Sequence, residues 1–349
     1  MSMVVAKIDW RQLYNFASRQ ALLGFCFDGI ERLTKEFSEE LKQNSMGRDL
    51  LMTWMGAAQQ IRRQNMKVNA VVGKLYSKFR EDGLRCCILK GQGNALMYPN
   101  PYSRTPGDID VWVNASREQI TEYAKKHFEI GDDIRFHHLE TSFDGVPVEL
   151  HFFPGIMNNP IYNVRLQKWF KRNADLQSNV VSLPDGIGEI AIPTTAFNVV
   201  YQLTHLYHHF FDEGIGMRQI IDYYYVVSML NVNCEMLTWL PKKLKYLGLW
   251  KFAGAVMYVL HEALGLSEEK MIAPMDEKRG KLLLAEILNG GNFGQHFTKY
   301  GHFTQQGMAK KYFLKIWRNM HFVRYYPAEA LSEPIFRTWH FFWRMKNKK

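Results

Sequence analysis

Apolar side chains are spaced in two different ways along the chain, and the change of spacing predicts three regions. Up to about residue 83, and again after about residue 190, they recur every three or four residues, which is the spacing of amphipathic helices. Between these positions they form short runs that alternate with polar residues, as strands do. We therefore predict an α+β fold with a small mixed-sheet core, residues 84–190, between an N-terminal helical region, residues 1–83, and a C-terminal helical domain, residues 191–349.

Two of the predicted strands form a hairpin. The runs Ile134–Phe143 and Val146–Phe153 are separated only by Asp144-Gly145, a dipeptide typical of a two-residue hairpin turn. Because side chains alternate along a strand, Glu149 and His151 share one face of the second arm, and the apolar residues between them face a core. The hairpin is therefore expected to present an acid and a histidine on the same face.

Another predicted strand, residues 109–113, carries the main candidate chemistry. Asp108, Asp110 and Trp112 share one face of it, and the apolar residues between them share the other. Two aligned carboxylates repel each other unless a cation joins them, so the pair is typical of a divalent-metal site. If this strand neighbours the one that carries Glu149, three acids converge, and two Mg²⁺ (or Mn²⁺) ions held by them can bind a nucleoside triphosphate and activate an attacking hydroxyl. The alternatives are a solvated strand edge for Asp108 and Asp110, and an ion pair of Glu149 with arginine or lysine.

A glycine-rich turn precedes this strand. Lys90-Gly91-Gln92-Gly93 follows an apolar run, and the backbone N–H groups of such a turn can bind phosphate oxygens, helped by the N-terminus of the helix that follows. Lys90 either contacts a phosphate or forms a salt bridge with one of the acids. For Arg104, in the loop before the aspartates, the alternatives are a phosphate or substrate contact and an ion pair of the loop.

These motifs occur in the same order as in a known family. Leu89-Lys90-Gly91, Arg104, Gly107-Asp108-Ile109-Asp110 and Val148-Glu149-Leu150-His151 are similar to the Lys-Gly, Arg-x-x-x-Asp-x-Asp and Glu-Leu-His motifs of a poorly characterised bacterial nucleotidyltransferase family. That family lies within the DNA polymerase β-type nucleotidyltransferase superfamily. The resemblance covers most of the chain, including the helical flanks of the core.

The resemblance implies an enzyme that transfers a nucleotidyl group from a nucleoside triphosphate to an acceptor, which is a small molecule, a protein or RNA. It implies that Asp108, Asp110 and Glu149 are catalytic and hold the metal ions, and that Lys90-Gly91-Gln92-Gly93 and Arg104 bind the nucleotide. The turn departs from the superfamily, in which it usually reads Gly-Ser or Gly-Gly, and the spacing between the turn and the two aspartates is longer than usual.

Polar residues of the C-terminal domain are candidates for a substrate cleft. One helical stripe consists of His205, His208, His209 and Asp212. Its spacing suits a zinc site, contacts with phosphate or substrate, or ordinary packing. Arg218 and Asp222 follow at the i, i+4 spacing of an ion pair within a helix. By resemblance, this region faces a cleft that holds the acceptor. The candidate cleft residues are His151, His205, His209, Arg218 and Asp222.

The composition is typical of a globular protein and not of a disordered or membrane-spanning one. Hydrophobic residues make up 47% of the chain and aromatic residues 14%, which is typical of a globular protein rather than a disordered one. No apolar run reaches the roughly 18–20 residues that span a bilayer, and charges interrupt the N-terminal residues before a secretory signal can form. The four cysteines include no Cys-x-x-Cys pair. We therefore expect a cytoplasmic protein without a membrane partner.

The net charge of +10 is concentrated near the C-terminus. Residues 309–349 contain ten lysines or arginines against two glutamates, a net charge of +8, with aromatic residues interleaved. Such a segment can bind a nucleic acid through phosphate contacts and base stacking, or it can be a packed set of helices with a solvated basic face. It motivates a second hypothesis, a catalytically inactive nucleotidyltransferase-like module that binds RNA or a protein partner. A toxin that acts on tRNA is a third hypothesis, which differs from the enzyme hypothesis only in its acceptor.

Overall fold

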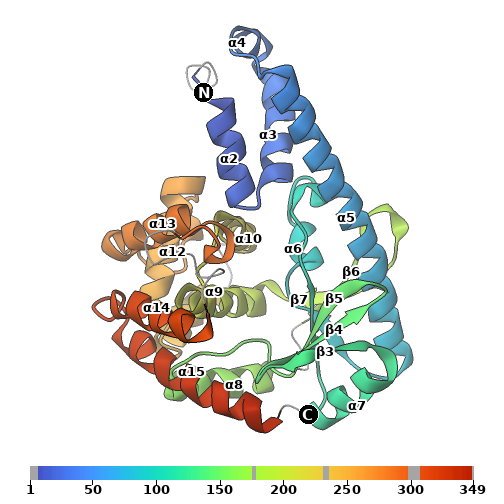
Figure 1. Ribbon diagram of the computed structural model, residues 1–349, viewed down its shortest axis with the longest axis vertical. Coiled ribbons are helices and arrows are strands. Elements are labelled where there is room, and N and C mark those ends of the chain that lie inside the picture. Colours follow the sequence, from blue (N-terminus) through green and yellow to red (C-terminus); the bar gives the residue numbers. More distant parts are fainter. Residues whose placement is uncertain (1–6, 175–177, 231–235, 298–306, 348–349) are drawn as a thin grey trace.

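Five strands form one mixed sheet in the computed structural model, which describes residues 7–174, 178–230, 236–297 and 307–347 (Figure 1). The strands are β1 (Cys86–Ile88), β2 (Ile109–Val113), β3 (Glu129–Ile134), β4 (His138–Phe143) and β5 (Val146–His151). Their order across the sheet is β1-β2-β5-β4-β3. Because β2 runs parallel to β5 and the other neighbours are antiparallel, the predicted mixed sheet is confirmed.

The predicted hairpin is also confirmed. Asp144 and Gly145 have φ angles of +49° and +68°, and a two-residue type I′ turn requires positive φ at both positions. The turn sets the register of β4 and β5, so that His138 lies opposite His151. The first arm starts at His138 rather than at Ile134, which belongs to β3.

Two strands are not predicted by the sequence pattern. Residues 129–134 form the edge strand β3, although three acids and a glycine among them are residue types uncommon in strands. Strand β7 (Glu189–Pro193), which pairs with β6 (Ser178–Ser182), is the second unpredicted strand. In both cases pairing with a neighbouring strand outweighs the weak local preference.

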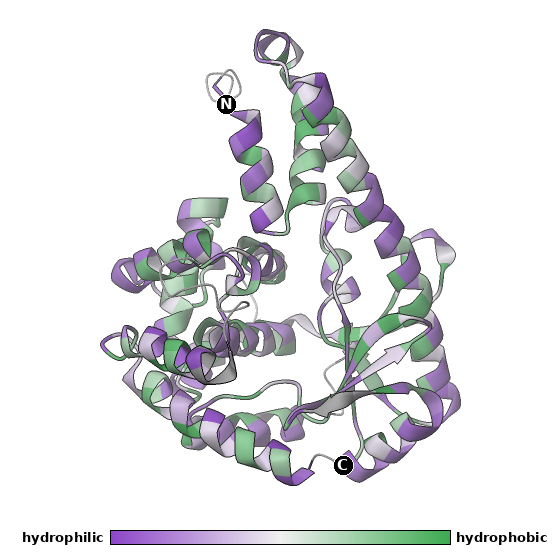
Figure 2. Ribbon diagram, viewed as in Figure 1, coloured by the Kyte–Doolittle hydropathy of each residue, from purple (hydrophilic) through white to green (hydrophobic). Residues whose placement is uncertain are grey.

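Helices cover the apolar face of the sheet. Ile109, Val111 and Val113 of β2 belong to the same buried cluster as side chains of α5 (Arg48–Glu81) and α7 (Arg117–His127). In Figure 2, α5 shows hydrophobic and hydrophilic residues interleaved along its length, including where it runs beside the sheet. The apolar side predicted for β2 is therefore confirmed.

The other face of β2 is directed towards α9 (Thr195–Asp212). Trp112 stacks on Phe197 of this helix, with ring centroids 5.6 Å apart and an interplanar angle of 14°. Both rings belong to the buried cluster of the C-terminal helices. Since Asp110 alternates with the apolar residues as Trp112 does, the acidic face of β2 is directed towards the C-terminal domain.

The N-terminal helices project beyond the sheet (Figure 1). Asp9 caps the first of them, accepting a hydrogen bond of 2.9 Å from the backbone N–H of Gln12. Helix α5 continues to the sheet, and Trp54 on it donates a 2.9 Å hydrogen bond to the carbonyl oxygen of Leu23. The helices that precede α5 are α2 (Trp10–Arg19), α3 (Leu23–Glu36) and α4 (Ser38–Gln43).

The region that follows the sheet is predominantly helical, as predicted. Its last helix lies along the lower edge of Figure 1, beside the sheet. Among the described residues, no helix is both long and apolar enough to cross a membrane. Apart from α9, the helices are α8 (Pro160–Asn173), α10 (Met217–Ser228), α11 (Met236–Tyr246), α12 (Trp250–Leu264), α13 (Glu277–Gly290), α14 (Met308–Met320) and α15 (Pro327–Asn347).

Candidate active site

Three carboxylates meet where β2 lies beside β5. The parallel register pairs Asp110 directly with Glu149, and Asp108 immediately precedes β2. One oxygen atom from each of the three lies within 4.8 Å of the others. The structure thus brings together the three acids that the sequence singled out, whereas their roles stay predictions.

The charges of these acids depend on their neighbours. The nearby Asp110 carboxylate and burial raise the pKa of Asp108 to about 6. For Glu149, burial opposes the charged form, but a hydrogen bond from His151 and the positive charges of His138 and Lys90 hold its pKa well below the usual range. Repulsion by Asp110 therefore disfavours the ionised form of Asp108, whereas neighbouring groups stabilise the ionised form of Glu149.

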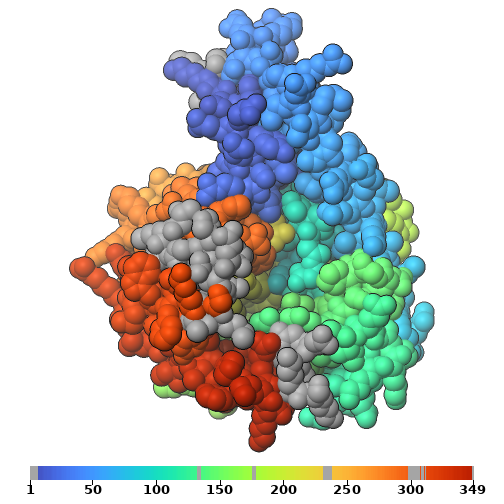
Figure 3. All heavy atoms as spheres, viewed as in Figure 1, coloured from blue at the N-terminus to red at the C-terminus, as the bar shows by residue number. Residues whose placement is uncertain are grey.

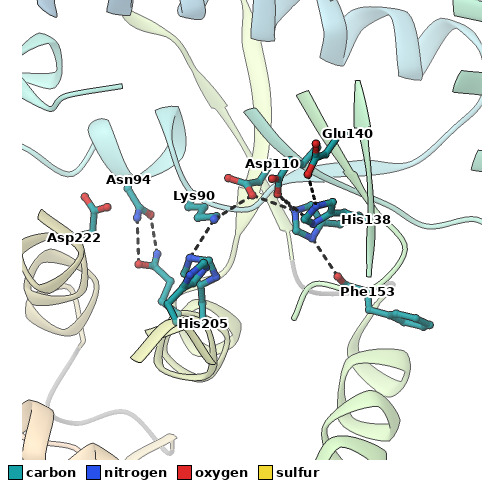
Figure 4. A network of polar contacts seen from close by, with 12 residues as sticks. Lys90, Asn94, Asp110, His138, Glu140, Phe153, His205 and Asp222 are labelled. Carbon is teal, nitrogen blue, oxygen red and sulfur yellow. Dashed lines mark hydrogen bonds and ion pairs between the residues drawn. The ribbon is translucent and has the colours of Figure 1, made fainter. Parts of the chain in front are cut away.

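Lys90 is the first of these neighbouring cations. Its Nζ lies 3.1 Å from Oδ1 of Asp110 and 3.1 Å from Nε2 of His205 on α9 (Figure 4). An ammonium group can only donate, so Nε2 of His205 is an acceptor and the ring is neutral. Burial and the charge of Lys90 hold the pKa of His205 well below its usual value, in agreement with this tautomer. Of the two alternatives for Lys90, the structure contains the salt bridge.

The glycine-rich turn divides into two parts. Gly91 has a φ of +57°, a conformation that favours glycine, and together with Lys90 it lines a small cavity beside the acids. Gln92 instead donates a hydrogen bond to the side chain of Asn69 on α5. A Cβ at Gly93 would lie 2.8 Å from Cγ2 of Ile192, so this glycine allows close packing on β7.

The helix after the turn is also shorter than expected. It is α6 (Gln92–Ala95), and it has four residues. A single helical turn supplies little of the dipole that a longer helix would direct at a phosphate. Nucleotide binding by Gln92 and Gly93 therefore stays a prediction that the geometry of the turn does not favour.

Arg104 binds an acid of the C-terminal domain. Its Nε and Nη2 donate to Oδ1 and Oδ2 of Asp222 at 2.8 and 2.7 Å, and all of these groups are buried. Asp222 also accepts a 2.7 Å hydrogen bond from the hydroxyl of Tyr98. Arg218 therefore does not form the expected ion pair with Asp222, and its Nη1 donates instead to the carbonyl oxygen of Thr105 at 3.0 Å.

A cleft of about 800 Å³ opens beside the acids. In Figure 3 the red C-terminal helices and the green strand region face each other across this part of the molecule. The sheet side of the cleft is lined by Asp108, Glu149 and His151, and the helical side by His205 and His209. The other candidate cleft residues, Arg218 and Asp222, line a smaller cavity of about 40 Å³ together with His205.

Two members of the histidine stripe on α9 have ionic partners of their own. Asp212 is bound by Nζ of Lys315 at 3.0 Å and by Nη2 of Arg337 at 2.6 Å, which joins α9 to α14 and α15. His209 Nδ1 lies 2.7 Å from a carboxylate oxygen of Glu213. Neither of the donor groups that could hold a metal in the described residues includes a residue of this stripe, so the zinc alternative is not supported.

One polar residue near the acids was overlooked in the sequence. His138 on β4 lies with Nδ1 3.3 Å from Oε2 of Glu149. The sequence contained the signal, because counting outward from a two-residue turn at Asp144-Gly145 places His138 opposite His151. A histidine in the first arm was therefore as predictable as the one in the second arm.

Comparison with known proteins agrees with the resemblance seen in the sequence. Residues 6–265 match the profile of a family described as uncharacterised nucleotidyltransferase. No curated protein matches the chain.

Solved structures give weak matches. An antigenic nucleotidyltransferase-like protein from Paracoccidioides brasiliensis has 15% sequence identity and a TM-score of 0.38, with 60% of this chain and 94% of that chain covered. A CCA-adding enzyme in complex with CTP has 10% identity and a TM-score of 0.21, and the Thermotoga maritima CCA-adding enzyme complexed with tRNA has 9% and 0.21; each match covers 80% of this chain and 81% of the other. At these TM-scores the matches carry no argument about function. The family profile, which spans most of the chain, is decisive: the protein belongs to the uncharacterised nucleotidyltransferase family.

Proposed function

We propose that this protein transfers a nucleotidyl group from a nucleoside triphosphate to a hydroxyl group of an acceptor, with Mg²⁺ or Mn²⁺ bound at Asp108, Asp110 and Glu149. The observation that carries the proposal is the meeting of these three carboxylates within 4.8 Å of one another at the wall of a large cleft. A cleft of about 800 Å³ lies in the size range of sites for nucleotide-sized ligands. Membership of the family supports nucleotidyl transfer in general.

The donor atoms suit a hard divalent cation. All three side chains offer carboxylate oxygens, which Mg²⁺ and Mn²⁺ prefer, and repulsion between Asp108 and Asp110 already raises the pKa of Asp108. When bound, the metal ions would supply positive charge to the phosphate oxygens and to the attacking oxygen. Asp108 and Asp110 would hold both ions, and Glu149 would hold the one nearer the acceptor.

The protein groups would position the reactants and move one proton. The acceptor oxygen would form a bond to the α-phosphorus, and the bond from the α-phosphorus to the pyrophosphate oxygen would break. Glu149 would help to remove the acceptor proton, which would leave the site with the products. Lys90, beside Asp110 at 3.1 Å, is close enough to the acids to contact a phosphate group bound there.

A transfer assay with matched variants tests the proposal. The protein would be incubated with α-labelled nucleoside triphosphates, Mg²⁺ or Mn²⁺, and separate panels of small-molecule, protein and RNA acceptors. Asp108→Asn and Asp110→Asn are expected to lower the transfer rate by at least about 100-fold. Asp144→Asn, in the exposed hairpin turn, is the matched control and should retain the rate. Unchanged transfer in both active-site variants would overturn the assignment.

RNA binding without turnover is a second candidate, because α14 and α15 expose aromatic side chains. Phe313, Trp317, Phe341 and Phe342 are between 48% and 69% exposed, and exposed rings beside lysine and arginine can stack on unpaired bases. Not all of the positive charge is on the surface, since Arg318 is buried and binds the carbonyl oxygen of Phe210.

Fluorescence anisotropy with labelled single-stranded RNA tests this candidate. We expect affinity to fall steeply with salt and Phe341→Ala with Phe342→Ala to weaken binding by at least about 10-fold. Val180→Ala, an exposed apolar residue of β6, is the control for a generally weakened surface. Binding that is independent of salt and of both rings would exclude this face as the RNA site.

A further inference from the structure

A second set of metal-ligand side chains shares Glu149 with the three acids. His138 and His151 lie opposite each other on β4 and β5. Nδ1 of His138 is 3.3 Å and Nε2 of His151 is 3.2 Å from the same atom, Oε2 of Glu149. All three donor atoms lie within 4.8 Å of one another. Donor atoms around a tetrahedral ion with bonds of about 2.1 Å are about 3.4 Å apart, close to both measured distances.

The hydrogen bonds of His151 are those of a metal ligand. Its Nδ1 faces the carbonyl oxygen of Phe153 at 3.3 Å, an acceptor, so Nδ1 carries a proton. Nε2 lies between two carboxylates, 3.0 Å from Asp110 and 3.2 Å from Glu149. A lone pair there would repel both oxygens, so a positive centre must lie at this nitrogen, either a proton or a metal ion. Metal-bound histidines typically direct their other N–H to a backbone carbonyl in this way.

His138 is oriented in a similar way. Its ring is buried, and neither ring nitrogen forms a well-directed hydrogen bond with any residue in the described part of the chain. Nδ1 is directed towards Glu149, and Nε2 lies 3.8 Å from Oε1 of Glu140. Arg135 holds that carboxylate through a 3.3 Å ion pair. Both ring nitrogens therefore face carboxylate oxygens without a well-directed hydrogen bond, and a metal ion at Nδ1 would join His138 to Glu149.

We propose that His138, Glu149 and His151 bind a divalent transition-metal ion, next to the oxygen-only site at Asp108 and Asp110. Two imidazoles and one carboxylate favour ions of intermediate softness, from Fe²⁺ to Zn²⁺, over Mg²⁺. The three protein ligands leave coordination positions open on the side of the cleft, which all three residues line. Glu149 bridges the two sites, so binding at one changes the charge available at the other.

This site can be tested without nucleotide, so its failure is distinct from failure of the proposed nucleotidyl transfer. Co²⁺ would be titrated into tag-free protein that has been stripped with a chelator, and visible absorption and calorimetry would be recorded. Co²⁺ bound by imidazole in a site of low coordination number gives visible bands that Co²⁺ on carboxylates and water alone gives only weakly. The variants are His138→Gln, His151→Gln, Asp108→Asn and the control His127→Gln, whose side chain is exposed on α7.

The expected result separates the two donor sets. His138→Gln and His151→Gln should each weaken Co²⁺ binding by at least about 10-fold and remove the visible bands. Asp108→Asn and His127→Gln should retain them, and circular dichroism should report folded protein throughout. The proposal is overturned if the wild-type protein gives no such bands, or if a folded His138→Gln or His151→Gln variant binds Co²⁺ with the wild-type affinity and spectrum.

Discussion

The guanidinium group of Arg104 donates hydrogen bonds to both carboxylate oxygens of Asp222, although the two residues lie far apart in the sequence. The bonds measure 2.8 and 2.7 Å, and both side chains are almost completely buried. Burial disfavours the charged carboxylate, but Arg104 holds the pKa of Asp222 below its usual range. The pair joins α10 to the loop that leads into Asp108, so the C-terminal domain helps to position the first acid of the site.

Removing one member of this pair should be costly. Asp222→Asn would leave the charge of Arg104 buried without its partner, and we expect the free energy of unfolding to fall by about 3–5 kcal/mol in urea titrations. Asp144→Asn is the control, because Asp144 pairs with Lys74 at the surface and should change stability by less than about 1 kcal/mol. Equal, small effects of both substitutions would show that Arg104 finds another partner or water.

A substitution of Lys90 distinguishes its two possible roles, a phosphate contact and a salt bridge with an acid. If it contacts phosphate, Lys90→Met should raise the dissociation constant of a non-hydrolysable nucleoside triphosphate by at least about 10-fold in calorimetry with Mg²⁺, a loss of about 1.4 kcal/mol. We expect this outcome, since Nζ is beside the acids and lines the cleft. Lys74→Met, on an exposed lysine that pairs with Asp144, is the control. An unchanged constant would restrict Lys90 to the salt bridge with Asp110.

Two glycines in helices should respond to alanine with opposite signs. At Gly56, exposed on α5, an added Cβ meets nothing within 4 Å, so Gly56→Ala should stabilise the protein by up to about 1 kcal/mol through helix propensity. At Gly280, on α13, the Cβ would lie 2.3 Å from the ring of Tyr258. Gly280→Ala should therefore destabilise by about 1–3 kcal/mol. Thermal unfolding of both variants measures the change in stability. Changes of the same sign would contradict the close contact between Gly280 on α13 and Tyr258 on α12.

Glu329 predicts a pH dependence of stability. It accepts hydrogen bonds from the backbone N–H groups of Asn158 and Asn159, and burial raises its pKa from 4.5 to about 7. Below pH 4.5 the carboxyl is protonated in both the folded and the unfolded state. As the pH rises from 4.5 to 7 the unfolded state loses its proton first, so the contribution of this group to stability falls, by about 3 kcal/mol in total.

The variant Glu329→Gln isolates this effect. Urea titrations of both proteins between pH 4.5 and 8 give a difference in unfolding free energy, and we expect the wild type to lose stability relative to the variant as the pH rises. Above pH 7 the difference should be constant. A difference that does not change with pH would show that Glu329 titrates in the folded protein as it does in the unfolded chain.

Local patterns in the sequence were sufficient to predict the strands that carry the site. The alternation around Asp110 and the Asp144-Gly145 turn each involve a few neighbouring residues, and both features are confirmed. The parallel pairing of β2 with β5 is non-local, so the meeting of Asp110 with Glu149 was only conditional in the sequence. The register of two strands joined by a short turn can be found by counting residues outward from the turn, whereas the pairing of strands that are distant in the sequence cannot be found in this way.

Polar contacts were less predictable than strands. The i, i+4 spacing suggested Arg218 as the partner of Asp222, but the buried carboxylate has a bidentate partner, Arg104, from another region. Similarly, sequence proximity placed Gln92 and Gly93 in a nucleotide-binding turn, although their neighbours are α5 and β7. For Asp222 a tertiary contact with better geometry replaces the local one, and such contacts leave no periodic signal in the sequence.

Parallel pairing of β2 with β5 also determines when the three carboxylates can meet during folding. The two arms of the β4–β5 hairpin are joined by a two-residue turn, so they can close on a timescale of roughly 1–10 μs. Pairing β5 with β2 must instead close the long loop that contains α7, β3 and β4, and such contacts of high sequence separation form late. In partly folded chains that retain only the hairpin, Glu149 and both histidines are already together, but the aspartates are not yet beside them. Such chains would therefore bind metal differently from the native protein.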